Sequence, residues 1–198
     1  MKFIEKPPPE EVERIFTRYG SPRFRRLEWN LNHLEHRRDY GSSRGVVVLL
    51  ISAVDHLVLV RYPDTPLDHW HLPSGRIRRL EPLEEAGKRE ALEQTGLSIE
   101  VTALPAVHIL DVRFKESELE LWHFLLLAEV RGGELHPQRE TIAEAAFQGD
   151  FAAFPNWRED PFQSKWYPLI LQDAGIVSGS LWEEPGRPPE KDRSGPAP

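Results

Sequence analysis

Residues 70–97, WHLPSGRIRRLEPLEEAGKREALEQTGL, contain the features that decide the fold. Pro82 can occupy the first position of a helix, where its missing N–H costs no hydrogen bond. Gly96 can adopt the left-handed conformation that ends a helix. We therefore predict a helix over residues 82–95, with residues 72–75 forming the loop that leads into it.

Two carboxylates and a carboxamide share one face of this predicted helix. Glu90, Glu93 and Gln94 are separated by three and four residues, so their side chains are neighbours. Carboxylates at such a short distance repel each other, and a cation would relieve the repulsion. Oxygen ligands of this kind suit Mg²⁺ or Mn²⁺. The alternative, from the helix alone, is a solvated acidic face in which Glu85 pairs with Arg89.

The spacing of residues 75–97 resembles the Nudix box, G-x5-E-x7-R-E-U-x-E-E-x-G-U, in which U is aliphatic. The residues that match it are Gly75, Glu81, Arg89, Glu90, Glu93, Gly96 and Leu97.

Three positions depart from the family pattern. Ala91 stands in an aliphatic position, which requires the sheet to approach the helix more closely. Gln94 replaces a Glu that usually ligates metal, so one negative charge is lost while a carbonyl oxygen remains as a neutral ligand. Leu80 replaces a Gly that is common before the first Glu, which makes the loop less free in its dihedral angles.

The resemblance implies an α/β fold, a Nudix-type α/β/α sandwich with a mixed β-sheet. We assign this domain to residues 44–182. Residues 1–43 form an N-terminal extension that is partly helical, and residues 183–198 are too polar and proline-rich to build a core, so we expect a disordered tail.

Hydrophobic periodicity predicts the other elements. Residues 22–39 fit a helix and a strand equally well, and we leave both open. The remaining expectations are an amphipathic helix after Pro9, a hairpin of strands 46–51 and 57–61, strands at 99–104, 107–114 and 119–130, a weakly helical alanine-rich segment within 139–154, and a final helix at 162–173.

Composition excludes several classes of protein. The 198 residues carry a net charge of −7, which argues against binding to polymeric nucleic acid. The chain has no cysteine and therefore no disulfide framework. The longest apolar run, residues 45–51, is too short to span a membrane, and no apolar signal segment opens the chain. We expect a soluble cytoplasmic protein, for which a homodimer is compatible.

The resemblance also implies the chemistry, which is hydrolysis of a nucleoside diphosphate linked to another moiety. Mg²⁺ or Mn²⁺ would be held by Glu90, Glu93 and Gln94, together with a backbone carbonyl of Ser74 or Gly75. Glu90 and Glu93 are thus the catalytic carboxylates. The family often takes a further carboxylate, as ligand or base, from a loop after the sheet. The candidates for it are Glu140 and Glu144, with Glu116, Glu118 and Glu120 as alternatives.

Other side chains near the box are candidates for binding the substrate. Arg76, Arg78 and Arg79 present planar donors for phosphates, unless they belong to a plain exposed loop. Trp70 either stacks on a base or braces the loop. We expect Glu81 and Arg89 to pair and hold the loop against the helix. Candidates for polar lining are His69, His71 and His123, although single histidines without ligand spacing are usually structural.

Two classes of function follow. The first is a metal-dependent pyrophosphohydrolase whose partner is a small, nucleotide-derived diphosphate. The second is a nucleotide-binding or sugar-nucleotide-binding regulatory module of the same fold, in which Gln94 marks lost catalysis. Around Arg113 and Phe114 we find neither the proline typical of ADP-ribose hydrolases nor the tyrosine of dinucleoside polyphosphate hydrolases, so the substrate stays unassigned.

Overall fold

A computed structural model of the chain describes residues 9–30, 45–53, 56–114, 117–149 and 154–176. Some expectations lie outside the described residues, namely the tail at 183–198, the part of the ambiguous segment after residue 30, and Lys115 and Glu116 of the turn. None of the described helices is long and apolar enough to cross a membrane.

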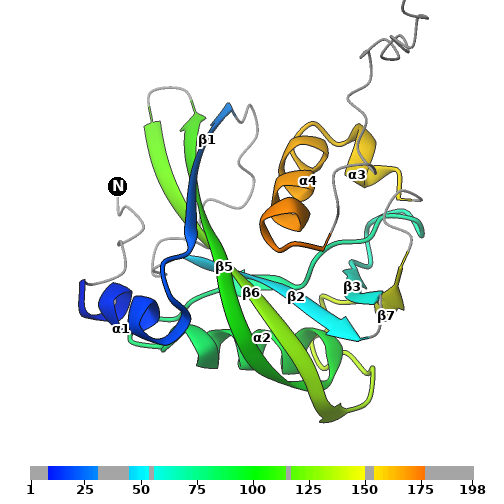
Figure 1. The fold of residues 1–198 in the computed structure, drawn as a ribbon. Helices are drawn as coiled ribbons and strands as arrows, with labels where there is room; N and C mark the ends of the chain where they lie inside the picture. Colours follow the sequence, from blue (N-terminus) through cyan, green and yellow to red (C-terminus); the bar gives the residue numbers. More distant parts are fainter. Residues whose placement is uncertain (1–8, 31–44, 54–55, 115–116, 150–153, 177–198) are drawn as a thin grey trace, which may run out of the picture.

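The described strands form one mixed sheet of seven strands (Figure 1). Its order is β1-β5-β6-β2-β3-β7, and β4 pairs with β2. The pairs β1–β5 and β2–β6 are parallel, and the other pairs are antiparallel. The strands are β1 Arg23–Asn30, β2 Val46–Ala53, β3 His56–Arg61, β4 Ser74–Arg76, β5 Leu97–Phe114, β6 Ser117–Gly133 and β7 Glu144–Gln148.

Helices cover both faces of this sheet. The helices are α1 Pro9–Tyr19, α2 Leu83–Thr95, α3 Asn156–Glu159 and α4 Gln163–Asp173. Strand β2 shows the layering most clearly, because its side chains alternate between the two cores. Val47, Leu49 and Ile51 pack in the core under α1 and α2. The intervening Val46, Val48 and Leu50 pack in the core under α3 and α4. A strand that is buried on both faces has a continuous apolar sequence, as β2 does. With helices packed on both faces of the sheet, the predicted α/β/α sandwich is confirmed.

Helix α2 lies close to the sheet because small residues line its inner face. Ala86 and Ala91 are fully buried, and Gly87 has Leu126 of β6 next to its Cα. Pro82 precedes the helix in an extended conformation instead of forming its first turn, and Gly96 ends it at φ 80°. The prediction for this helix is therefore correct to within one residue.

Three predictions about secondary structure need correction or completion. Residues 23–30 form a strand, which pairs with β5 along its whole length. The strand β5 does not end before Pro105 but continues through it, with shifts in register that accommodate the missing N–H. In its described part the alanine-rich segment is not helical, since residues 144–148 form β7 at the edge of the sheet beside β3. Sheet pairing here outweighs the helix propensity of alanine.

Candidate functional site

Strand β4 brings its backbone against the carboxylate face of α2. It pairs with β2 through Ser74, Gly75 and Arg76, which fixes its position on the sheet. A Cβ atom added at Gly75 would overlap with the carboxylate of Glu90. Only glycine permits this approach. The box therefore needs Gly75 because a buried carboxylate lies directly against the backbone there.

The predicted pair of Glu81 and Arg89 is present and locks the loop to the helix. Arg89 donates from Nε to Glu81 at 2.7 Å and from one terminal nitrogen at 2.8 Å. That nitrogen also donates to the carbonyl of Arg76 at 2.8 Å, and Glu81 accepts from the backbone N–H of Arg78 at 2.8 Å. Burial would raise the pKa of Glu81, but its hydrogen bonds from Arg89 and Arg78 hold it below its ordinary value. Both groups are charged, and their contacts hold the loop in place.

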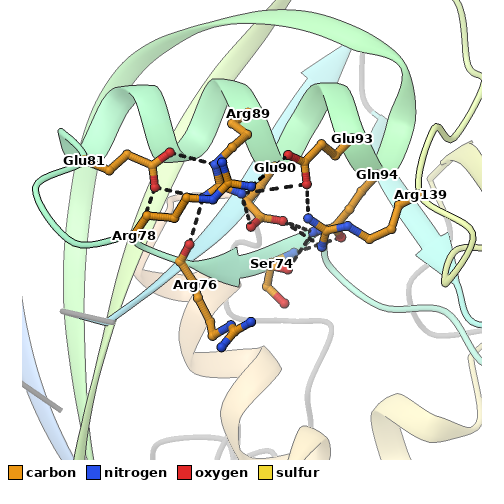
Figure 2. Close-up of polar contacts among 9 residues, drawn as sticks. All are labelled: Ser74, Arg76, Arg78, Glu81, Arg89, Glu90, Glu93, Gln94 and Arg139. Carbon is orange, nitrogen blue, oxygen red and sulfur yellow. Dashed lines mark hydrogen bonds and ion pairs between the residues drawn. The ribbon is translucent and has the colours of Figure 1, made fainter. Parts of the chain in front are cut away.

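Glu90 and Glu93 lie side by side on α2 and share arginine partners (Figure 2). Glu90 is 3% exposed, whereas the side chain of Glu93 is 29% exposed. Arg89 donates to Glu90 at 2.5 Å, and Arg78 reaches Glu93 at 3.4 Å. The site thus contains one buried and one accessible carboxylate.

Arg139 inserts its guanidinium between these two carboxylates (Figure 2). One of its terminal nitrogens lies 3.0 Å from Glu90, and the other donates to Glu93. Its loop is fixed to α2, since the backbone N–H groups of Gln138 and Arg139 donate to the carbonyl of Glu93 at 3.0 and 2.9 Å. Burial would lower the pKa of Arg139, and the two carboxylates more than offset this, so the group stays charged.

Gln94 presents its amide nitrogen to the site. This nitrogen donates to Glu90 and to the carbonyl of Ser74, at 2.7 Å in each case. The amide oxygen accepts from the backbone N–H of Ser74 at 3.4 Å. Turning the amide over would set its oxygen against two acceptors, so its partners define this orientation. In this structure Gln94 is a donor to the predicted ligands, and its expected role as an oxygen ligand requires the amide to turn.

The two candidate bases from the later loop are both exposed. Glu144 is on β7, where its 51% exposed side chain pairs with Arg61 at 3.2 Å. Glu140 is exposed in a turn. Its neighbour Arg139 is the residue of this loop that reaches Glu90 and Glu93. Of the alternatives, Glu120 pairs with Arg26 at 2.9 Å, and Glu116 lies outside the described residues.

Sequence reasoning missed Arg139. The loop was expected to supply an additional acid, and no motif or spacing marks the arginine beside Glu140 as a site residue. The one available signal was the excess of carboxylates on the helix face, which calls for a cation from some other part of the chain.

A comparison with known families decides the identity of the domain. The NUDIX domain model matches residues 41–170. The chain belongs to the Nudix family.

Relatives of the Nudix domain agree with this assignment. A Bacillus subtilis (strain 168) protein named "Putative 8-oxo-dGTP diphosphatase" is 36% identical over 66 residues. The match covers 33% of this chain and 43% of that protein, so the chain spans less than half of the relative's length.

Solved Nudix structures share the fold. The Bacillus subtilis pyrophosphohydrolase superposes with a TM-score of 0.50 at 16% identity, over 72% of this chain and 87% of its own. A NUDIX hydrolase from Nitrosomonas europaea superposes with a TM-score of 0.49 at 20% identity, over 68% of this chain and 87% of its own.

The Nudix box residues fit a hard cation by the chemistry of their donors. Glu90, Glu93 and the carbonyl of Ser74 supply oxygen atoms, the ligands that Mg²⁺ prefers. Within the described ranges no group of three or more His, Cys, Asp or Glu side chains could hold a metal ion. The oxygen atoms of this set accept from Arg139 and Gln94. A divalent ion at these oxygen atoms would have to displace the N–H donors of Arg139 and Gln94.

The predicted substrate-binding residues differ in their exposure: the three arginines are exposed, and Trp70 is buried. Arg76, Arg78 and Arg79 are exposed around the site, although the side chain of Arg76 points away from the carboxylates (Figure 2). Trp70 is only 7% exposed, and its carbonyl accepts from Trp157 at 2.7 Å. This placement favours bracing of the loop over stacking on a base.

Burial keeps two of the three predicted histidines neutral. It lowers the pKa of His71 to about 4 and that of His123 to about 3. His71 lies against Tyr62, with ring centroids 5.0 Å apart, and His123 packs edge-on against Trp166 at 4.7 Å. Both rings are part of the packing at neutral pH.

Proposed function

We propose that this Nudix protein is a metal-dependent pyrophosphohydrolase acting on a nucleoside diphosphate linked to another moiety. The observation that carries the proposal is the pair of adjacent carboxylates on α2. Both share Arg139, and Glu90 meets the glycine loop at a point where only Gly75 leaves room for its carboxylate. The relatives named as diphosphatase and pyrophosphohydrolase support the reaction class.

Glu90 and Glu93 are the residues that would hold Mg²⁺ or Mn²⁺, with the carbonyl of Ser74 as a further oxygen. When bound, such an ion neutralises phosphate oxygens and makes a bound water more acidic. Glu90 is buried and fixed by Arg89, so it sets the position of the site. Glu93 is the more exposed of the two carboxylates and is available to a water molecule from solvent.

The arginines would orient the diphosphate. Arg78 is 64% exposed, and it contacts Glu93 at 3.4 Å, so its guanidinium lies at the solvent side of the carboxylates. Planar guanidinium groups donate in pairs to phosphate oxygens. Arg79 is exposed in the same loop. Glu140 and Glu144 stay predictions for the general base.

A second function is favoured by a separate observation. Arg139 and Gln94 direct N–H groups at the oxygen atoms that a metal would need. A protein that keeps this arrangement would bind nucleotides or sugar nucleotides without hydrolysing them. This is the binding or regulatory module.

Hydrolysis of a panel of diphosphates, with and without Mg²⁺ or Mn²⁺, tests the proposal. The measured quantity is the release of the nucleotide product, separated by chromatography, because cleavage of the diphosphate gives phosphomonoesters or pyrophosphate and no free phosphate. The panel should include 8-oxo-dGTP, ADP-ribose, UDP-sugars and dinucleoside polyphosphates. We expect metal-dependent release from at least one compound, abolished in Glu93→Gln. Glu85→Gln is the matched control, because Glu85 is on the same helix, is 58% exposed and pairs with Lys88. Binding of a panel member without any release would favour the binding module.

A further inference from the structure

Arg139 and Arg89 both contact Glu90, but they are held very differently. Arg89 donates twice to Glu81 and once to the carbonyl of Arg76, and its side chain is 16% exposed. The side-chain contacts of Arg139 go to Glu90 and Glu93, and its side chain is 32% exposed. Removing Arg89 from Glu90 would break the lock between loop and helix, whereas Arg139 can leave without disturbing that lock.

The backbone of Arg139 stays in place when its side chain moves. Its N–H and that of Gln138 donate to the carbonyl of Glu93, so the loop is fixed to α2 independently of the guanidinium. The side chain can therefore exchange partners by rotating about its own bonds. Such rotations take place within nanoseconds in exposed side chains.

Charge balance couples this side chain to a divalent ion. Two carboxylates one turn apart repel each other, and the guanidinium now offsets that repulsion. An ion and the guanidinium cannot use the same carboxylate electron pairs at once. A guanidinium that leaves them needs another anion, and a diphosphate bound beside the carboxylates offers pairs of oxygens that match its fork.

We infer that Arg139 is an exchangeable counter-cation of this site. In the metal-free protein it lies between Glu90 and Glu93, and it passes to the phosphate oxygens when a divalent ion arrives with a diphosphate. This inference rests on the proposed metal-dependent function. It makes Arg139 a positioning residue that couples the binding of metal to the binding of substrate, because either ligand alone must compete with an existing ion pair.

Calorimetry of Mn²⁺ binding to the full chain, with and without methylenediphosphonate, tests the coupling. This diphosphate analogue has a P–C–P bridge that water does not cleave. We expect Arg139→Gln to bind Mn²⁺ alone roughly tenfold more tightly than the wild type, since the carboxylates no longer have a competing cation. The analogue should tighten Mn²⁺ binding in the wild type by several-fold more than in Arg139→Gln, which has lost the donor for the phosphates.

Two further variants separate exchange from a general charge effect. Arg131→Gln removes the same charge from an exposed pair with Glu100 on β5 and should leave both affinities unchanged. Arg139→Lys keeps a cation but not the fork, so Mn²⁺ affinity should stay near the wild-type value while the gain from the analogue falls. It also provides a folded variant if Arg139→Gln is unstable.

The negative outcomes are distinguishable. If wild type and Arg139→Gln bind Mn²⁺ equally and the wild type has metal-dependent turnover, the exchange is wrong and the proposed function stands. If no variant binds Mn²⁺ and none hydrolyses a compound of the panel, both the exchange and the proposed function are wrong. If the analogue tightens Mn²⁺ equally in the wild type and in Arg139→Gln, Arg139 does not pass to the phosphates.

Discussion

Helix α2 carries an arginine–carboxylate cluster at each end, and the two clusters differ in how their charges balance. At its start, Glu84 accepts from Arg14 through both oxygens, at 2.9 and 2.8 Å, and from Tyr19 at 3.2 Å. Its side chain is 8% exposed. These partners come from α1, so this cluster attaches the N-terminal helix to the domain. One carboxylate has a full set of donors and needs no further cation.

Further along the helix, Glu90 and Glu93 share the guanidinium of Arg139. Two adjacent negative charges are less easily satisfied by protein groups than one, and the shared cation is partly exposed. Arginine–carboxylate contacts alone therefore do not distinguish a cluster that attaches a helix from one that could bind a cation. The two clusters differ in whether the carboxylates outnumber the arginines that are held by further contacts.

The largest effect should come from neutralising the second cluster. We expect Glu90→Gln and Glu93→Gln each to lower kcat/KM by on the order of 10³, because each removes a charged ligand of the ion. Glu93→Gln should melt near the wild-type temperature, since Glu93 is partly exposed. Glu90→Gln should cost some stability because Glu90 is buried. Steady-state kinetics and thermal melting measure both. Turnover at the wild-type level in either variant at saturating Mg²⁺ would place the ion elsewhere.

Adding a third acid to the same cluster should separate stability from metal binding. Gln94 donates to Glu90 and to the carbonyl of Ser74, so Gln94→Glu replaces two hydrogen bonds by repulsion. We expect the metal-free variant to lose about 2–3 kcal/mol of unfolding free energy. Mg²⁺ should bind roughly tenfold more tightly, because the charge of the ligands tunes oxygen sites.

Melting with and without Mg²⁺, together with calorimetry, checks the Gln94→Glu prediction. Higher turnover would support the hydrolase, whereas tighter metal binding without hydrolysis of any diphosphate would support the binding module. Unchanged Mg²⁺ affinity would show that position 94 does not face the ion.

At the first cluster, a substitution should change stability and leave turnover alone. Glu84→Gln should cost about 1–2 kcal/mol of unfolding free energy, through the loss of charged hydrogen bonds to Arg14. Burial would raise the pKa of Glu84, but its bonds from Arg14 and Tyr19 hold it below the ordinary value of 4.5. A lowered pKa in the folded state stabilises the protein above about pH 4.5, and this contribution is lost as pH falls through the lowered value.

Urea unfolding at pH 7 and at about pH 3 tests whether the contribution of Glu84 to stability is lost in acid, as its lowered pKa predicts. The gap in stability between wild type and Glu84→Gln should be largest at pH 7 and should narrow on acidification. A gap that widens in acid would mean that Glu84 is protonated in the folded protein. A loss of turnover at pH 7 would mean that the two clusters on α2 are not independent.

Local features of these clusters could be predicted from the sequence, and their distant partners could not. The helix, its end at Gly96 and the pairing of Glu81 with Arg89 follow from short spacings within one loop and one helix. Arg139 lies 46 residues from Glu93, and the topology that joins them depends on the whole sheet. The orientation of Gln94 also escaped prediction, because an amide offers both a donor and an acceptor, and only the surrounding acceptors decide between them.

The prediction of a helix for the residues of β7 was wrong for a similar reason. Residues 144–148 have the composition of a helix, but they lie at the edge of the sheet, where β3 offers unpaired backbone groups. The strand β1 stayed ambiguous in the sequence because its apolar residues fit both periods. Pairing with β5 and the packing of Phe24 on Phe16 of α1, at 6.0 Å between ring centroids, decide for the strand.

The smallest effect concerns the loop between β4 and α2. Leu80 has φ 63° and is 85% exposed, and among the described residues other than glycine it is the one with a positive φ. A left-handed conformation costs a branched residue about 1–2 kcal/mol, and glycine avoids that cost but loses more backbone entropy on folding, about 0.4–1 kcal/mol. Leu80→Gly should therefore raise the unfolding free energy by about 1 kcal/mol or less.

Leu80→Ala is the matched control, because it removes the same exposed side chain and keeps the strain. A Leu80→Gly variant that melts below Leu80→Ala would show that the backbone at Leu80 stores no strain, because only the entropic cost of glycine would then remain. A Leu80→Gly variant that melts above Leu80→Ala would show that the loop before the Glu90–Glu93 cluster is held under strain, in the segment where Glu81 is fixed by Arg89.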